Sequence, residues 1–208
     1  MEKSKRIVSG HMIGLKQEFE EPYSSLHKHA SPEVLQRIRQ SNIIDFSIFL
    51  NHSSLFSHMV YVGNDFLGDM KALSSDKSTR EWWTLAEPMH NPFEFRKENG
   101  CWSEVELWYT LEMSKASSTN YFRSAYRVAV PSDMPESVPA EIFGDIDFWG
   151  TTYNLNSFKI FKGKTNLFIY LETYELTDLN PFMDIVTRVL KTDASLNEMK
   201  EIFHMPSI

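Results

Sequence analysis

The chain has 208 residues, of which 42% are hydrophobic and 24% are charged, a composition typical of a globular protein with a core of its own. Its 21 basic and 28 acidic residues give a formal net charge of −7, which argues against nucleic acid or an anionic membrane as a partner. A single cysteine, Cys101, excludes an internal disulfide and a cysteine-based zinc site. Because the sequence shows neither an apolar run of roughly 20 residues nor a secretory signal, we expect a cytoplasmic protein.

The first half of the chain alternates strand and helix patterns. Strands are expected over residues 7–15, 43–50, 55–62 and 103–111. A helical stretch begins with acidic Glu18, Glu20 and Glu21 and tolerates Pro22 in its first turn, and further helices are expected over 32–41, 65–74 and 78–86. The resulting order, β-α-β-β-α-β, is the ferredoxin-like arrangement.

The second half repeats this order less completely. Strands are expected over 122–130, 153–161, 166–174 and 198–205, with a helix over 179–191 and a proline-interrupted segment, 131–146, in place of the first helix. The polar residues 114–121 between the halves indicate a linker. We therefore expect one ferredoxin-like half over residues 1–113 and a degenerate one over residues 122–208.

Two short alignments support a tandem copy. The segment IDFSIFL at 44–50 parallels LNSFKIF at 155–161, and VELWYTL at 105–111 parallels MKEIFHM at 199–205. Ferredoxin-like units leave one sheet face open, and two such faces can bury each other. We predict an α+β fold in which the halves associate within the chain as a pseudo-dimeric α+β barrel, and further oligomerisation remains open.

Tyr23 and His27 are the first candidates for chemistry, because residues four apart on a helix share a face. They form either a proton-transfer pair or a core tyrosine beside a solvated histidine. The adjacent Trp82 and Trp83 point about 100° apart on a helix, so one indole could form a wall for a sugar, or one could pack inward and the other lie on the surface. For His11, His29 and His58 a structural or solvated role is the simpler interpretation.

Motifs for other chemistry do not occur in the sequence. There is no His-Glu-x-x-His pattern, no glycine-rich phosphate loop and no Gly-x-Ser-x-Gly elbow. We therefore expect neither a metal nor a cofactor, and a small molecule rather than a macromolecule as the ligand.

The first half resembles the L-rhamnose mutarotase family. The resemblance is carried by Tyr23-Ser-Ser-Leu-His27 with Pro32-Glu33 after it, by Arg80-Glu81-Trp82-Trp83, and by the C-terminal segment from Glu198 to Pro206. It implies that His27 is the proton donor at the ring oxygen and that Tyr23, Trp82 and Trp83 contact the sugar. Phe46 falls where the family has a second substrate tyrosine, so one hydroxyl contact is missing.

The activity implied by the resemblance is cofactor-free interconversion of the α and β anomers of a 6-deoxy monosaccharide, with L-rhamnose as the expected substrate. L-Fucose or another sugar is an alternative substrate, and a non-catalytic sugar-binding or regulatory barrel is an alternative class. A monooxygenase-like barrel would rest on fold analogy alone. The second half lacks both motifs, so we expect one active site per chain.

Overall fold

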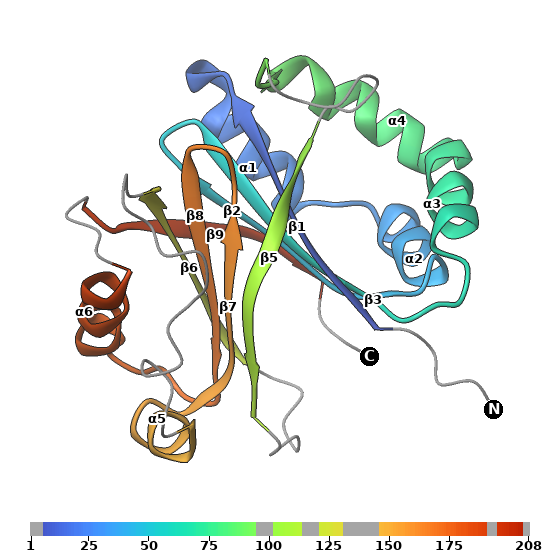
Figure 1. The fold of residues 1–208 in the computed structure, drawn as a ribbon. Coiled ribbons are helices and arrows are strands. Elements are labelled where there is room, and N and C mark those ends of the chain that lie inside the picture. Colours follow the sequence, from blue (N-terminus) through green and yellow to red (C-terminus); the bar gives the residue numbers. More distant parts are fainter. Residues whose placement is uncertain (1–5, 95–101, 114–120, 131–145, 191–194, 206–208) are drawn as a thin grey trace. The chain divides into compact units, whose positions relative to one another are not determined.

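The computed structural model describes residues 6–94, 102–113, 121–130, 146–190 and 195–205 (Figure 1). Contacts between Cα atoms divide the chain into two compact units, residues 1–104 with 201–208 and residues 105–200. Both divisions fall inside strands, β5 (Ser103–Glu112) and β9 (Asn197–Met205), each of which contributes residues to both units. The predicted halves, 1–113 and 122–208, remain a prediction, and the predicted linker lies outside the described residues except for Tyr121.

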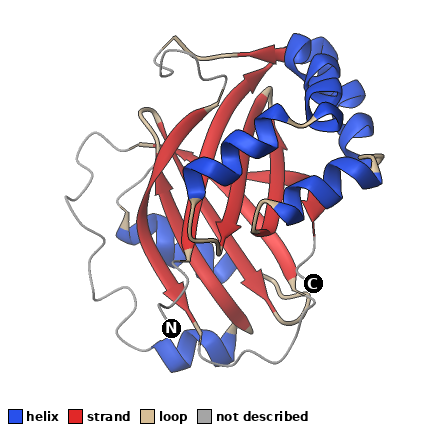
Figure 2. Cartoon of the chain, turned by 90° about the vertical axis from the view of Figure 1, so that its right-hand side faces the viewer, coloured by secondary structure: helices blue, strands red, loops and turns tan. Residues whose placement is uncertain are grey.

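The first unit has an antiparallel sheet with helices on one face. Its elements are β1 (Ile7–Leu15), η1 (Gln17–Phe19), α1 (Glu20–Lys28), α2 (Pro32–Gln40), β2 (Ile43–Asn51), β3 (Ser54–Tyr61), α3 (Phe66–Ser75), α4 (Lys77–Ala86), η2 (Glu87–Met89) and β4 (His90–Asn91). Strand β3 pairs with β1 on one side and with β2 on the other, and β4 pairs with β1. Figure 2 shows the helices lying over one face of the strands.

Local sequence explains where these helices begin. The Ser31 side chain accepts a hydrogen bond from the Val34 N–H, directly before Pro32 at the first helical position of α2. Asp65 and Asp76 cap α3 and α4 in the same way, accepting from the backbone N–H groups of Gly68 and Thr79. A serine or aspartate side chain thus forms the N-cap of each of these three helices.

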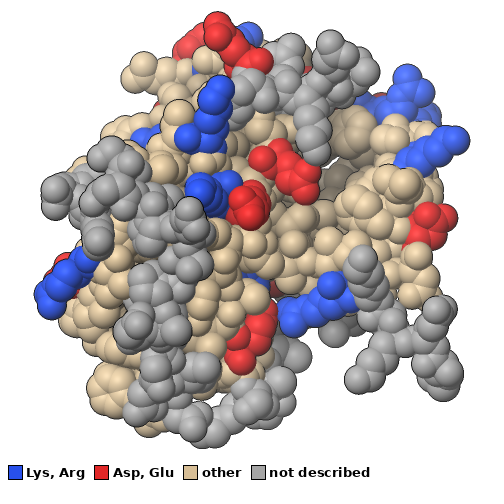
Figure 3. All heavy atoms as spheres, in the orientation of Figure 1, with Lys and Arg blue, Asp and Glu red and all other residues tan. Residues whose placement is uncertain are grey.

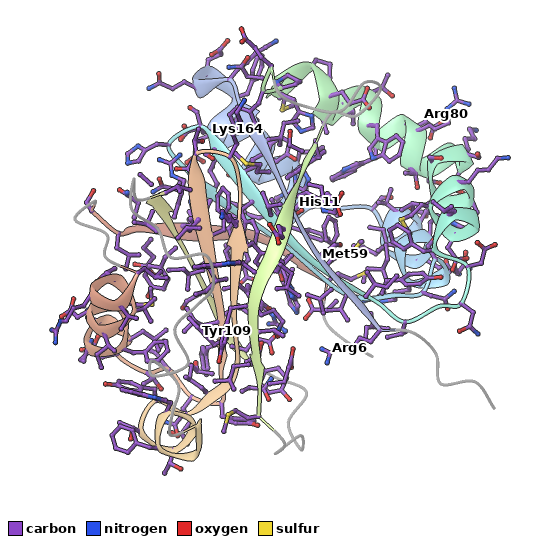
Figure 4. All side chains as sticks on the ribbon, viewed as in Figure 1. Arg6, His11, Met59, Arg80, Tyr109 and Lys164 are labelled. Carbon is purple, nitrogen blue, oxygen red and sulfur yellow. The ribbon has the colours of Figure 1, made fainter. Side chains whose placement is uncertain are left out.

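The core of the first unit lies between the sheet and its helices. Alternation along the strands directs Ile13, Ile48, Leu55 and Met59 to this side, where they pack with Tyr23 of α1 and with apolar residues of α2 and α4. His11 and Met59, labelled in Figure 4, lie on β1 and β3 on the side facing the helices. Each fully buried Leu, Ile or Met side chain contributes about 1.5–3 kcal/mol of transfer free energy.

The second unit repeats the plan of an antiparallel sheet with a helix against it. Its elements are the rest of β5, β6 (Phe122–Ala129), α5 (Ile146–Thr152), β7 (Leu155–Lys162), β8 (Asn166–Thr173), α6 (Asn180–Val189) and the first residues of β9. The strands pair in the order β5-β7-β8-β6-β9. Phe182, Met183 and Val186 of α6 pack on the sheet. The predicted α+β class is confirmed. Residues 131–145, most of the segment expected in place of a first helix, lie outside the described residues.

Candidate active site

Helix α1 presents three buried residues to the interior of the first unit, Tyr23, Ser24 and His27. The start of the helix is fixed because the Glu20 carboxylate accepts hydrogen bonds of 2.9 Å from both the backbone N–H and the hydroxyl of Ser53, in the turn between β2 and β3. With this end held, the spacing of four residues places the Tyr23 phenol and the His27 imidazole on the same buried face.

The two rings lie in direct contact. Their centroids are 4.1 Å apart with an interplanar angle of 32°, and the side chains of Tyr23 and His27 are 1% and 7% exposed. His27 Nδ1 lies 3.0 Å from the Tyr23 carbonyl oxygen. Because a carbonyl can only accept, Nδ1 carries the proton and Nε2 of the neutral ring is left as an acceptor.

Aromatic side chains from two other elements complete the surroundings of His27. The Trp82 ring of α4 meets it edge-on at 5.4 Å, and the Phe203 ring of β9 meets it edge-on at 5.9 Å. Phe46 of β2 lies 5.7 Å from Phe203. The structure therefore brings four of the five residues singled out from the sequence together, whereas Trp83, half-buried, is turned by about 100° from Trp82 on the same helix.

A pocket of about 370 Å³ opens beside His27. This volume falls in the range of about 300–1,000 Å³ that small-molecule sites occupy. The residues that line it come from the end of α1, from α2 and from β9: His27, Lys28, Ala30, Leu35, Glu201, Ile202, Phe203 and His204. Apolar and hydrogen-bonding groups thus meet in this pocket.

Two further histidines, one lining this pocket and one beside Tyr23, were not singled out from the sequence. His204 lines the pocket, and its Nδ1 forms a 2.9 Å hydrogen bond with the Ser47 hydroxyl. His90 of β4 lies with its Nε2 3.2 Å from the Tyr23 hydroxyl. Neither could be found from spacing alone, because each is more than 60 residues from the group that it meets.

Burial keeps Tyr23, His27 and His90 uncharged near neutral pH. It raises the pKa of the Tyr23 phenol. It lowers the pKa of His27 to about 4, an effect that the hydrogen bond to the Tyr23 carbonyl opposes and the nearby His90 reinforces. Burial also lowers the pKa of His90 to about 4. At pH 7 the site therefore offers a neutral imidazole acceptor and a protonated phenol.

The surface and the remaining side chains show what else the described part of the chain offers. Within it, no cluster of three or more His, Cys, Asp or Glu residues could hold a metal ion, and no helix has both the length and the apolarity to cross a membrane. On the face seen in Figure 3, basic and acidic side chains are interspersed.

Fold and site together define an α+β protein of ferredoxin-like units with a buried tyrosine–histidine pair, whose histidine lines a pocket of about 370 Å³. Residues 9–111 match the family model described as L-rhamnose mutarotase. This segment of the chain belongs to the L-rhamnose mutarotase family. No curated protein gives a significant match to the sequence.

Solved structures with a similar fold carry a different description. A candidate monooxygenase from Fusobacterium nucleatum subsp. nucleatum has a TM-score of 0.53 at 12% identity, covering 98% of this chain and 95% of its own. A second candidate monooxygenase, from Lactobacillus acidophilus, has a TM-score of 0.53 at 6% identity and covers 98% of both chains. At these identities the likeness shows the fold alone, since one fold hosts many chemistries.

Proposed function

We propose that the protein is a cofactor-free sugar mutarotase that interconverts the α and β anomers of a 6-deoxy monosaccharide, with L-rhamnose as the first substrate to test. The observation that supports this best is the His27–Tyr23 pair, in ring contact beside a pocket of suitable size, within the segment that matches the mutarotase family. A proton acceptor and a proton donor are the two groups that opening of a cyclic hemiacetal needs.

The resemblance implies that His27 is the acid at the ring oxygen, but its lowered pKa favours the opposite role, and we assign His27 as the base in ring opening. With a pKa of about 4, roughly one His27 side chain in a thousand is protonated at pH 7, so the neutral ring is the form that meets the sugar. Its Nε2 takes the proton of the anomeric hydroxyl while the bond between C1 and the ring oxygen breaks. In ring closure the same imidazolium returns its proton to the carbonyl oxygen, which makes it the acid of the reverse step.

Tyr23 gives the second proton in this scheme. Its raised pKa keeps the phenol protonated, so the hydroxyl can donate to the ring oxygen as that oxygen leaves C1. Trp82, in edge contact with His27, provides an apolar surface for the C–H face of the sugar. Phe203 and Phe46 extend the apolar side of the site.

Phe46 bears on which sugar is bound, not on the reaction that is catalysed. The family tyrosine implied at this position would read a substrate hydroxyl, and a phenylalanine cannot donate a hydrogen bond to it. A site that loses one such bond loses selectivity more readily than it loses the reaction. L-Fucose and other 6-deoxy sugars are therefore tested beside L-rhamnose.

The test is anomer exchange measured by saturation-difference NMR on L-rhamnose and L-fucose with wild type, His27→Asn and His29→Asn. His29 is a matched control, since its Nδ1 bonds the Ser25 carbonyl four residues back at 2.8 Å but the side chain is exposed. We expect His27→Asn to lower the rate by about 10²–10⁴-fold and His29→Asn to leave it within about twofold.

Two results would contradict the proposal. Exchange that survives in His27→Asn at the wild-type rate removes the imidazole from the reaction. A wild type that changes its tryptophan fluorescence on adding sugar, yet exchanges no anomers, favours the non-catalytic sugar-binding alternative.

A further inference from the structure

His90 is buried in the first unit, in contact with the Tyr23 side chain. It is 8% exposed. Its ring lies 5.4 Å from that of Tyr23 and 5.9 Å from that of Trp102, edge-on to the indole. His90 is therefore packed in the same aromatic cluster as the proposed catalytic pair.

The backbone holds His90 tightly in this place. His90 pairs with Leu15, and Asn91 pairs with Gly14, where a Cβ atom would collide with the Asn91 carbonyl oxygen. The Lys16 N–H also donates a 2.9 Å hydrogen bond to the Met89 carbonyl. The short strand β4 is thus fixed against the end of β1, which keeps the His90 imidazole next to the Tyr23 phenol.

The hydrogen bond between His90 Nε2 and the Tyr23 hydroxyl can run in two directions. A phenol has one hydrogen. If Tyr23 gives this hydrogen to His90 Nε2, none is left for a sugar. If His90 donates from Nε2, the phenol oxygen is held by an N–H group and its hydrogen is left for another acceptor. Only the second arrangement lets Tyr23 act as an acid.

We propose that His90 is the positioning residue of the second proton transfer: its Nε2–H holds the Tyr23 oxygen, directs the phenol hydrogen toward the sugar and stabilises the charge that develops on the oxygen. This inference rests on the proposed mutarotase function. The N–H donor is aimed in advance at the oxygen where negative charge appears, which is how an oxyanion hole works.

The other nitrogen of the His90 ring, Nδ1, is left for a partner that is not among the described residues. Nδ1 is buried and has no hydrogen-bond partner among the described residues. Buried polar atoms are nearly always paired, so an exception calls for an explanation. With the proton on Nε2, Nδ1 is an acceptor, so its missing partner is a hydrogen-bond donor.

The step balances with two protons and no cofactor. In ring opening, the bond between C1 and the ring oxygen breaks and the C1 carbonyl forms. The anomeric proton passes to His27 Nε2, and the Tyr23 proton passes to the ring oxygen. The phenolate that remains lies beside the His90 N–H and the His27 imidazolium. Closure on the other face of the carbonyl returns both protons.

The experiment compares His90→Gln, His90→Asn, Tyr23→Phe and the double variant Tyr23→Phe/His90→Asn in anomer exchange. The amide nitrogen of Gln can take the place of Nε2, whereas the shorter Asn cannot reach the phenol. We expect His90→Asn to lower kcat by about tenfold or more with KM within about threefold, and His90→Gln to retain most of the rate. In the Tyr23→Phe background, His90→Asn should cost no more than about twofold, because the two residues act as one unit.

Three results would overturn the inference. If His90→Asn and His90→Gln lower kcat equally, or if the losses of kcat multiply in the double variant, His90 has only a packing role. A wild type sensitive to His27→Asn but not to His90→Asn overturns this inference alone, whereas an inactive wild type overturns the proposed function as well. If His90→Asn does not fold, ¹⁵N NMR of the wild type decides, since a proton on His90 Nδ1 instead of Nε2 contradicts the proposal.

Discussion

The pH dependence of anomer exchange tests the state in which His27 works. With a pKa of about 4 for the free enzyme, His27 is about half neutral at pH 4, about 90% neutral at pH 5 and fully neutral by pH 7. If the neutral ring is the base, kcat/KM should be flat between about pH 5.5 and pH 8 and should fall below pH 5, toward half its plateau at about pH 4. An unperturbed histidine would place this fall near pH 6.5 instead.

The opposite assignment predicts an opposite profile. If the reaction started from protonated His27 as the acid, kcat/KM would fall about tenfold for each pH unit above about 5, or about 500-fold between pH 4 and pH 7. The difference arises because burial without a charged partner penalises the imidazolium. The two assignments therefore separate clearly over a range in which the assay is simple.

The assay is saturation-difference NMR on a single sugar at constant ionic strength and low buffer concentration, with the spontaneous exchange at each pH subtracted. Circular dichroism at each pH shows whether the protein stays folded. The His29→Asn variant should give the same profile as the wild type. A rate that rises steadily as the pH drops from 8 to 5 would refute the base assignment and with it the burial argument for His27.

The remaining predictions concern stability, the tryptophans and Phe46. In the unfolded chain His27 binds a proton below about pH 6.5, but in the folded protein only near pH 4, so the free energy of unfolding should fall as the pH drops through this window, by at most about 3 kcal/mol for this group. Urea titrations at several pH values should show that His27→Asn removes this part of the pH dependence of the free energy of unfolding. An unchanged pH dependence in the variant would contradict the prediction. Trp82→Ala should raise KM about tenfold or more, whereas Trp83→Ala should leave KM within about twofold, because Trp82 contacts His27 and Trp83 is turned away from it. Equal changes in KM would show that the contact between Trp82 and His27 is unimportant for binding. Phe46→Tyr should change the ratio of kcat/KM between L-rhamnose and L-fucose by about tenfold, and an unchanged ratio would place the sugar away from β2.

Hydrophobic periodicity was enough to find most elements of the described chain. The strands predicted at 7–15, 43–50 and 55–62 agree with β1, β2 and β3 to within one residue. The predicted helix over 78–86 agrees equally well with α4. Such agreement is expected where one face of each element is buried, because the period of the apolar residues then records the geometry directly.

Short and irregular elements were missed. Strand β4 has two residues, too few to show any alternation, and it forms because Gly14 lets the Asn91 backbone approach β1 closely. The two three-residue 3₁₀ helices, one before α1 and one before β4, have no periodic signature either. These are the elements that bring His90 to Tyr23.

The sequence by itself determined the α+β class and placed Tyr23 and His27 on one helix face, because residues four apart on a helix share a face whatever surrounds them. Only the tertiary structure decided the protonation state of this pair and which other residues surround it. Burial sets the pKa of His27, and burial depends on Trp82 and Phe203, which come from distant parts of the chain. The bond between His90 and Tyr23 joins residues 67 positions apart, a distance at which sequence carries no rule of spacing and only folding creates the contact.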